Sequence, residues 1–147
     1  MNMWNGHIAI VTGGSSGLGA ASAVALAERG MRLAIFDVNE EAGRAKAAAL
    51  GGMFCKVDVA DPSSVIAGID AVEAEMGIPR VLVNCAGIGP IGKTVSRGKP
   101  HDPEVFANGI RINLIGTFNC ASQVAARTVA ALSLIHISEP TRRTSIA

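Results

Sequence analysis

Short apolar runs of strand length alternate with amphipathic stretches of helix length along this chain, and that alternation limits its possible folds more than any other feature. The apolar runs are 7–11, 31–36, 53–57 and 80–83. They are apolar at mostly consecutive positions rather than alternate ones, as in strands that helices cover on both faces. Four strand–helix units in strict alternation predict an α/β fold with a parallel, doubly wound sheet.

The helices between these runs carry their own start and stop signals. Asn39 can cap a helix that has two glutamates in its first turn, and Asp61 combines a cap with a proline at the next position. In the helix predicted from Leu18 to Arg29, Ala21, Val24 and Ala25 share one face. A last helix is expected from about Glu104 into residues 125–131. Glycines that end three of the helices are Gly30, Gly51 and Gly77.

Composition and charge exclude several function classes. The net charge is +1, from 13 lysines and arginines against 12 aspartates and glutamates, so we expect no nucleic-acid partner. No apolar run approaches the roughly 20 residues of a bilayer span, so we expect no membrane insertion. Cys55, Cys85 and Cys120 show no paired spacing, which favours free thiols over a metal site or disulfides. Without a signal-like N-terminus, the expected location is cytoplasmic.

A glycine-rich turn follows the first apolar run and opens the first helix. At this position glycines let backbone N–H groups approach a pyrophosphate, which then sits at the positive end of the helix dipole. A tight turn that merely packs the helix on the strand is the alternative. The expected cofactor-binding residues of this turn are Thr12, Gly13, Ser15, Ser16, Gly17, Leu18 and Gly19.

Asp37 ends the second apolar run, 18 residues after Gly19. A carboxylate at this interval can bind the adenosine ribose hydroxyls of a dinucleotide, and it would repel a 2′-phosphate. Neither Ser15, Ser16 nor Val38 supplies a cation for such a phosphate. We therefore expect NAD rather than NADP, although a solvated aspartate at the end of a strand would look the same.

Four motifs occur in a fixed order between residues 7 and 127: the TGxxxGxG turn, Asp58-Val59, Asn84–Gly87 and Asn113. In this combination the chain resembles the short-chain dehydrogenase/reductase superfamily, whose fold is a Rossmann sheet. The resemblance implies that Asp58 holds the adenine amino group, with Val59 beside the ring. It also implies that the segment Asn84, Cys85, Ala86 and Gly87 lines the ribose, Cys85 acting through its backbone.

Asn113 matches the fourth member of the catalytic tetrad of that superfamily. The resemblance implies that this residue bends the last helix and holds a water linked to the catalytic lysine. Its spacing from Phe106, Ile110 and Thr117 places it on one apolar helix face. A buried, hydrogen-bonded asparagine with no catalytic role is the alternative.

Within the superfamily the chain is similar to the short-chain type 3-hydroxyacyl-CoA dehydrogenases, through residues 83–88, the following loop and residues 116–119. This similarity implies NAD-linked oxidation of a secondary alcohol, with an acyl-CoA as the small-molecule substrate and a homo-oligomer for the full-length enzyme. Lys93, Arg97 and Lys99 of the loop could face the phosphates of CoA. A solvated basic loop is the alternative.

The rest of the superfamily pattern is missing. The chain contains no tyrosine, so the Tyr-x-x-x-Lys motif is absent, and the serine that would accompany it cannot be placed. We interpret 1–131 as an NAD-binding segment holding only the four N-terminal βα units, and 132–147 as a non-native tail similar to a translated sequencing adapter. The expectation is the cofactor half of a dehydrogenase, inactive alone. The alternatives are a non-catalytic dinucleotide-binding or redox-sensing module, or a structural protein that binds no cofactor.

Overall fold

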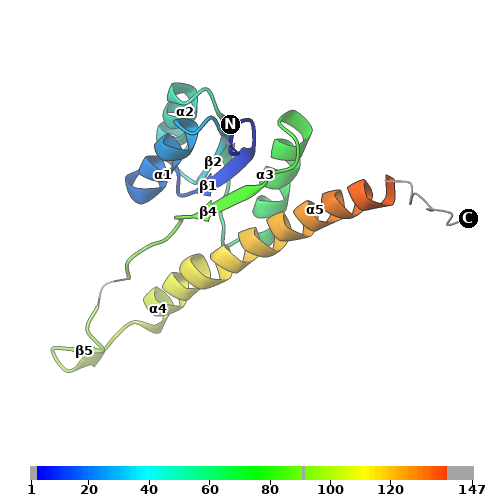
Figure 1. Cartoon of the computed structure of the whole chain (residues 1–147). Helices are drawn as coiled ribbons and strands as arrows, with labels where there is room; N and C mark the ends of the chain where they lie inside the picture. Colours follow the sequence, from blue (N-terminus) through cyan, green and yellow to red (C-terminus); the bar gives the residue numbers. More distant parts are fainter. Residues whose placement is uncertain (1–2, 91, 139–147) are drawn as a thin grey trace, which may run out of the picture.

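The computed structural model describes residues 3–90 and 92–138, and the predicted tail lies outside it from residue 139 on. As far as residue 84, strands and helices alternate as expected (Figure 1). In chain order they are β1 (Ile8–Thr12), α1 (Gly17–Ala27), β2 (Arg32–Asp37), α2 (Glu40–Ala49), β3 (Met53–Lys56), α3 (Pro62–Glu75), β4 (Val81–Asn84), β5 (Val95–Ser96), β6 (Lys99–Pro100), α4 (Pro103–Ile110), the π-helical segment η1 (Arg111–Ile115) and α5 (Gly116–Ser138).

The four main strands form one parallel sheet in the order β3-β2-β1-β4. Ile10 pairs with Ala34 of β2 and with Leu82 of β4, so β1 lies in the middle. The chain moves outward from β1 to β2 and β3, and then crosses back to place β4 on the other side of β1. This reversal between β1 and β4 is the switch point at which open α/β sheets bind ligands. The predicted α/β Rossmann-like fold is confirmed.

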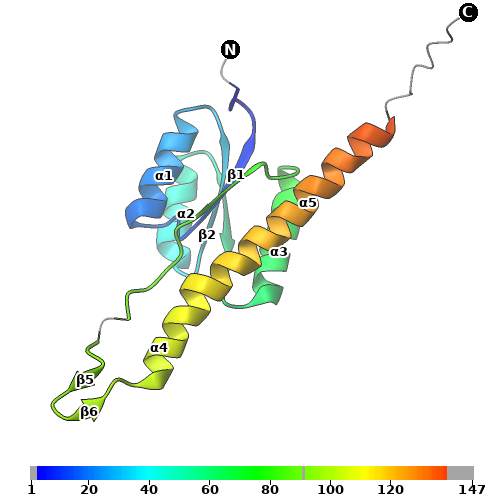
Figure 2. The same ribbon diagram turned by 60° about the horizontal axis from the view of Figure 1, so that its bottom comes forward.

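Helices cover both faces of the sheet, as Figure 2 shows. Alternate strand residues point to opposite sides: Ile8 and Ile10 join a core cluster with α3 and α5, whereas Ala9 and Val11 join another with α1 and α2. The central strands β1 and β2 are therefore buried on both faces, which explains why their sequences are apolar without alternation.

The predicted inner face of α1 is wrong. Gly19 and Ala23 are the buried residues of this helix, whereas Ala21 is exposed. Small apolar residues occupy nearly the whole helix, so the sequence lacks the contrast between polar and apolar positions that reveals a buried face. The caps at Asn39 and Asp61 are confirmed, since their side chains accept hydrogen bonds from Ala42 N and Ser63 N at 3.1 and 2.9 Å.

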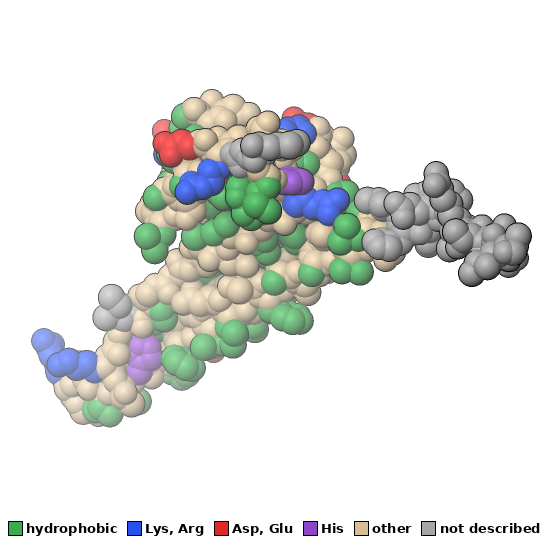
Figure 3. Space-filling view, viewed as in Figure 1, with side chains coloured by type: hydrophobic (Ala, Val, Ile, Leu, Met, Phe, Trp, Pro, Cys, Tyr) green, Lys and Arg blue, Asp and Glu red, His purple; other side chains and the backbone are tan. Residues whose placement is uncertain are grey.

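A single long helical rod, made of α4, η1 and α5, crosses the molecule beside α3 (Figure 2). Cys120 and Val124 pack into the core, and Asn119 Nδ2 donates a hydrogen bond of 2.9 Å to the Val59 carbonyl. The opposite side of the rod carries exposed apolar side chains, which Figure 3 shows along its length. They include Leu114, Ile115, Phe118 and Val129.

The last helix extends beyond the expected residues 125–131, because α5 continues to Ser138. Leu132 to Ser138 contains neither glycine nor proline, and the next proline in the chain is Pro140. Nothing in those residues therefore stops a helix. No helix in residues 3–90 and 92–138 has both the length and the apolar character that crossing a lipid bilayer requires.

Candidate functional site

A cleft of about 440 Å³ lies where the carboxyl ends of the four parallel strands meet. Its walls come from the end of β2 and from the segments that follow β1, β2, β3 and β4, and one residue comes from η1. The lining residues are Gly13, Ser15, Ser16, Gly17, Leu18, Gly19, Phe36, Asp37, Val38, Asn39, Val57, Asp58, Val59, Cys85, Ala86, Gly87, Ile88 and Ile112. The cleft thus occupies the switch point of the sheet.

Two glycines let the turn after β1 fold tightly against its neighbours. Gly13 has φ +62°, and a Cβ there would lie 2.7 Å from Ala86 N in the turn after β4. A Cβ on Gly19 would collide with the Gly13 carbonyl. Larger residues would therefore push α1 away from the strand ends and fill the space where a ligand's phosphates could meet the backbone.

The N-terminus of α1 faces the cleft with its amides unshielded by a side chain. Within the described residues, the N-cap Ser16 makes no side-chain cap hydrogen bond, and the first turn holds no acidic residue. By contrast, the side chains of Asn39, Asp61 and Asp102 cap α2, α3 and α4. The positive end of the α1 dipole is thus open to an anionic ligand.

Asp37 is fixed at the end of β2 by backbone and side-chain donors. Its Oδ2 accepts hydrogen bonds from Ser15 N at 3.1 Å and from Ser15 Oγ at 2.5 Å. Its Oδ1 accepts one from Asn39 N at 2.9 Å. The carboxylate thereby joins the turn after β1 to the turn after β2, and it remains half-buried at the wall of the cleft.

Thr12 does not line the cleft, but it holds in place a turn that does. Its side chain is buried, and its Oγ1 accepts hydrogen bonds from Cys85 N and Ala86 N, both at 3.1 Å. One β1 side chain therefore fixes the turn after β4 against the glycine-rich turn. Asn84, which is exposed at the last position of β4, is likewise not among the described lining residues.

Asn113 neither lines the described cleft nor lies on a buried face. Its side chain is exposed, as are Phe106 and Ile110, so the predicted apolar face is not packed against the protein. The π-helical turn at η1 adds a residue and shifts the helical spacing on which that prediction depended. The side chain is nevertheless hydrogen-bonded twice, accepting from Ile88 N and donating to the Ile88 carbonyl, both at 2.8 Å.

Sequence reasoning missed six of the lining residues. Phe36, Val38, Asn39 and Val57 flank the predicted aspartates at strand ends, so extending each motif by one or two residues would have found them. Ile88 directly follows the predicted Asn84–Gly87 segment. Ile112 enters the cleft through the long helix, 24 residues later in the chain, and only the fold brings it there.

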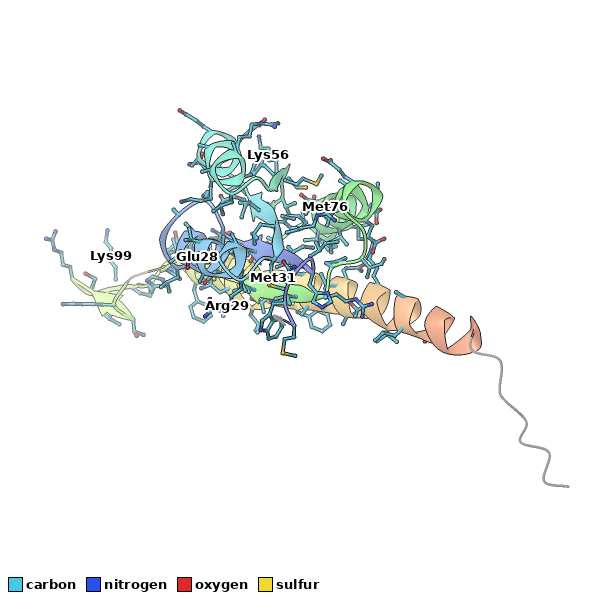
Figure 4. The ribbon with its side chains drawn as sticks, turned by 45° about the horizontal axis from the view of Figure 1, so that its top comes forward. Glu28, Arg29, Met31, Lys56, Met76 and Lys99 are labelled. Carbon is cyan, nitrogen blue, oxygen red and sulfur yellow. The ribbon has the colours of Figure 1, made fainter. Side chains whose placement is uncertain are left out.

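The charges at the cleft are negative. Asp37 and Asp58 lie in its wall, and among the described residues no lysine, arginine or histidine does. The Asp58 carboxylate accepts a hydrogen bond from Ala60 N at 2.9 Å but is otherwise exposed. Lys99 lies on the β5–β6 hairpin, well away from the sheet (Figure 4). Neither it nor Lys93 or Arg97 reaches the wall of this cleft.

Cys85 is the half-buried thiol of the cleft, whereas the other two cysteines belong to the core. Burial raises the pKa of Cys55 to about 11, with Glu75 adding to the shift, and burial alone raises the pKa of Cys120 to about 11. Cys55 Sγ lies 3.8 Å from the Gly68 carbonyl. These two thiols are packing groups, and only Cys85 touches the candidate site.

The parallel sheet, the glycine turn and the acidic strand end together define an α/β protein of the Rossmann-like class with a ligand cleft at the switch point. A family model described as short chain dehydrogenase matches residues 7–133. The chain belongs to the short-chain dehydrogenase family, whose members are oxidoreductases that typically use NAD or NADP.

Three known proteins illustrate this relationship. The chain is 36% identical over 124 residues to human 3-hydroxyacyl-CoA dehydrogenase type-2, covering 82% of this chain and 48% of that protein. It is 40% identical over 134 residues to D-threitol dehydrogenase of Mycolicibacterium smegmatis, covering 86% and 49%. A crystal structure named ribose-5-phosphate isomerase, from Brucella melitensis, superposes with a TM-score of 0.78 at 35% identity, covering 86% and 48%.

The chain spans about half the length of each of these three proteins. By their names, two of these proteins are dehydrogenases and one is an isomerase. The three names differ more than the folds and sequences do. The family assignment therefore depends on the match of the family model to residues 7–133.

Proposed function

We propose that this chain is the NAD-binding half of a short-chain dehydrogenase. The observation that carries the proposal is the cleft itself, in which glycine backbone, an uncapped helix N-terminus and a fixed carboxylate line one continuous wall. The glycine backbone lets the phosphates of a dinucleotide come close, and the helix N-terminus attracts their negative charge. The carboxylate suits the adenosine ribose.

The proposed contacts follow from what each lining group can donate or accept. The N–H groups of Gly17, Leu18 and Gly19 at the start of α1 would hold the pyrophosphate. Asp37 would accept a hydrogen bond from the ribose, and Asp58 would accept one from the adenine amino group. Val59, Cys85, Ala86 and Gly87 would pack against the adenosine half, with Thr12 and Asn84 supporting the turns from outside the cleft.

NAD fits this cleft better than NADP does. A 2′-phosphate would enter beside the Asp37 carboxylate and would find no basic residue among the described lining residues. An unpaired negative charge next to another one is costly in a partly desolvated site.

The whole enzyme's reaction is proposed to be hydride transfer between a secondary alcohol and the cofactor, with a 3-hydroxyacyl-CoA as the substrate. The bound nicotinamide supplies the hydride chemistry. Support for the substrate comes from relatives named 3-hydroxyacyl-CoA dehydrogenase type-2 in several animals. Because these 147 residues contain no tyrosine, the phenol that would exchange the proton is missing, and we propose that the chain alone does not turn over.

Calorimetric titration of the 147-residue chain with NADH tests the proposal. We expect measurable binding that falls about tenfold or more in Asp37→Ala, the loss of roughly one charge-assisted hydrogen bond. Glu41→Gln is the matched control, because this exposed α2 carboxylate is outside the cleft. Absence of NADH binding in the unmodified chain, or equal affinities in Asp37→Ala and Glu41→Gln, overturns the proposal.

A non-catalytic dinucleotide-binding or redox-sensing module is the second candidate, and the lack of tyrosine favours it. Both candidates predict NADH binding, so binding alone does not separate them. The gene sequence downstream of codon 131 does: a serine followed by Tyr-x-x-x-Lys supports the dehydrogenase, and a native stop codon supports the module.

A further inference from the structure

We infer that Ser15 is a positioning residue that sets the preference for NAD over NADP by holding the Asp37 carboxylate in the wall of the cleft. This inference rests on the proposed function, which places the adenosine ribose at Asp37. It adds a residue of the glycine-rich turn whose side chain acts on a carboxylate 22 positions later in the chain.

Ser15 donates two hydrogen bonds to one carboxylate oxygen of Asp37. Its backbone N–H and its hydroxyl both donate to Asp37 Oδ2, at 3.1 and 2.5 Å, while Asn39 N donates to Oδ1 at 2.9 Å. Hydrogen bonds to a charged acceptor are the stronger kind, and the serine hydroxyl makes the shortest of these three. Both residues are half-buried, so water competes less for these bonds than it would at the open surface.

A count of acceptor positions shows why this matters for selectivity. An ionised carboxylate offers about four lone-pair positions, and three of them are already used by Ser15 and Asn39. The remaining position suits the hydroxyl group of an unmodified ribose, which can donate a proton. A 2′-phosphate would present charge instead, and the carboxylate could avoid it only by rotating away and breaking the bonds to Ser15.

Ser16 provides a comparison within the same turn. It also lines the cleft, but it is exposed and, within the described residues, its side chain accepts no capping hydrogen bond from the first backbone amides of α1. No contact joins it to Asp37 among the hydrogen bonds of the described residues. Removing its hydroxyl should therefore affect NADH and NADPH alike, whereas removing that of Ser15 should change their ratio.

The test is to measure the Kd of NADH and of NADPH for the unmodified chain and for Ser15→Ala, Ser15→Thr and Ser16→Ala. We expect Ser15→Ala to lower the ratio of the NADPH Kd to the NADH Kd about three- to tenfold, the size of one weakened charge-assisted bond. Ser15→Thr keeps the hydroxyl and should keep the ratio, as should Ser16→Ala. Thermal melting identifies any variant that fails to fold, and Ser15→Cys, a weaker donor of similar size, then replaces Ser15→Ala with the same expected direction.

A double-mutant cycle shows whether Ser15 acts through Asp37. In the Asp37→Ala background, the additional change Ser15→Ala should leave the ratio the same within about twofold. A ratio that changes in that background as much as in the unmodified chain overturns the positioning role. An unchanged ratio in Ser15→Ala overturns the inference while leaving the proposed function intact, whereas an unmodified chain that binds neither coenzyme overturns both.

Discussion

The side chain of Asn113 and the backbone of Ile88 are joined by two opposed hydrogen bonds, each 2.8 Å long. The amide group satisfies both the N–H and the C=O of one residue 25 positions earlier, much as a neighbouring strand would. Ile88 also lines the cleft, so this pair ties the long helical rod to the wall of the candidate site.

Replacing Asn113 should weaken the attachment of the helical rod to the cleft wall at Ile88. We expect Asn113→Ala to lower the free energy of unfolding by about 1 kcal/mol, because an exposed hydrogen-bond pair is partly replaced by water. Asn113→Asp should cost more, since a carboxylate cannot donate to the Ile88 carbonyl and would face it with a negative charge. Urea unfolding followed by circular dichroism measures both, with Asn108→Ala on α4 as the control. Equal stability of all three variants would contradict the importance of the pair.

Gly19 should tolerate no side chain. A Cβ there meets the carbonyl of Gly13, so Gly19→Ala must shift α1 or the turn, and we expect a loss of about 2–4 kcal/mol in unfolding free energy. Ala21→Ser, at an exposed position on the same helix, should have little effect. A Gly19→Ala protein as stable as the unmodified chain would show that the turn has more room than this structure gives it.

The three cysteines should differ in reactivity. At pH 8 an aromatic disulfide reagent should modify Cys85 first, because Cys55 and Cys120 are buried and have pKa values raised to about 11. Cys85→Ser should therefore remove the fast phase, and denaturant should expose the two slow thiols. If NADH binds as proposed, it should also slow the reaction at Cys85. A fast phase that survives in Cys85→Ser would argue against the assignment.

The same raised pKa values make stability depend on pH in a defined direction. Folding raises the thiol pKa of Cys55 and Cys120 from 9.0 to about 11, so the folded state holds their protons more tightly than the unfolded state does. The contribution is complete below pH 9 and is lost as the pH rises toward 11. Replacing both cysteines by alanine should flatten this decline in unfolding curves measured at a series of pH values. A decline of the same steepness in the double variant would trace it to other groups.

Arg127 should be the ion-paired residue that matters most for stability. It pairs with Asp70 and with Glu73 of α3, the Nε–Oε1 distance to Glu73 being 3.1 Å, and its side chain is only 20% exposed. Arg127→Met would remove the only ion-pair partner that both carboxylates have among the described residues, and we expect a loss of about 1–3 kcal/mol.

Two further variants test whether the loss of stability comes from the unpaired carboxylates. Adding Glu73→Gln to Arg127→Met should restore part of the loss, because one of the two carboxylate charges left without a cation is removed. Glu40→Gln should change stability little, since the pair of Glu40 with Arg44 is on the surface. A larger effect of Glu40→Gln than of Arg127→Met would reverse the expected order.

Sequence patterns predicted the central sheet well, because strands that are buried on both faces have mostly apolar sequences. Runs such as 53–57 are apolar at every position but one, Lys56, and local signals at Asn39 and Asp61 mark where helices begin. The aspartate at the end of β2 was also predictable, because its position after the glycine-rich turn follows from one strand–helix–strand unit. These features depend on residues close together in the chain.

Features that depend on distant contacts were not predictable in the same way. The hydrogen bonds from Ser15 to Asp37 form only once β1 and β2 are paired, and no local pattern announces them. The buried face of α1 is invisible in a helix built almost wholly of small apolar residues. Asn113 was predicted to share one apolar helix face with Phe106, Ile110 and Thr117 because the spacing assumed an ordinary α-helix, whereas η1 widens the turn at that point.

That widened turn acts as a spacer between two halves of one rod. With an extra residue taken up at 111–115, the side chains of α4 are rotated relative to those of α5, so α5 can remain anchored on the core at Cys120 while Asn113 contacts Ile88 after β4. Deleting a single residue there would force the rod into uniform winding. Either the packing of Cys120 in the core or the hydrogen bonds between Asn113 and Ile88 would then be lost, because a uniformly wound helix cannot direct both residues toward their partners.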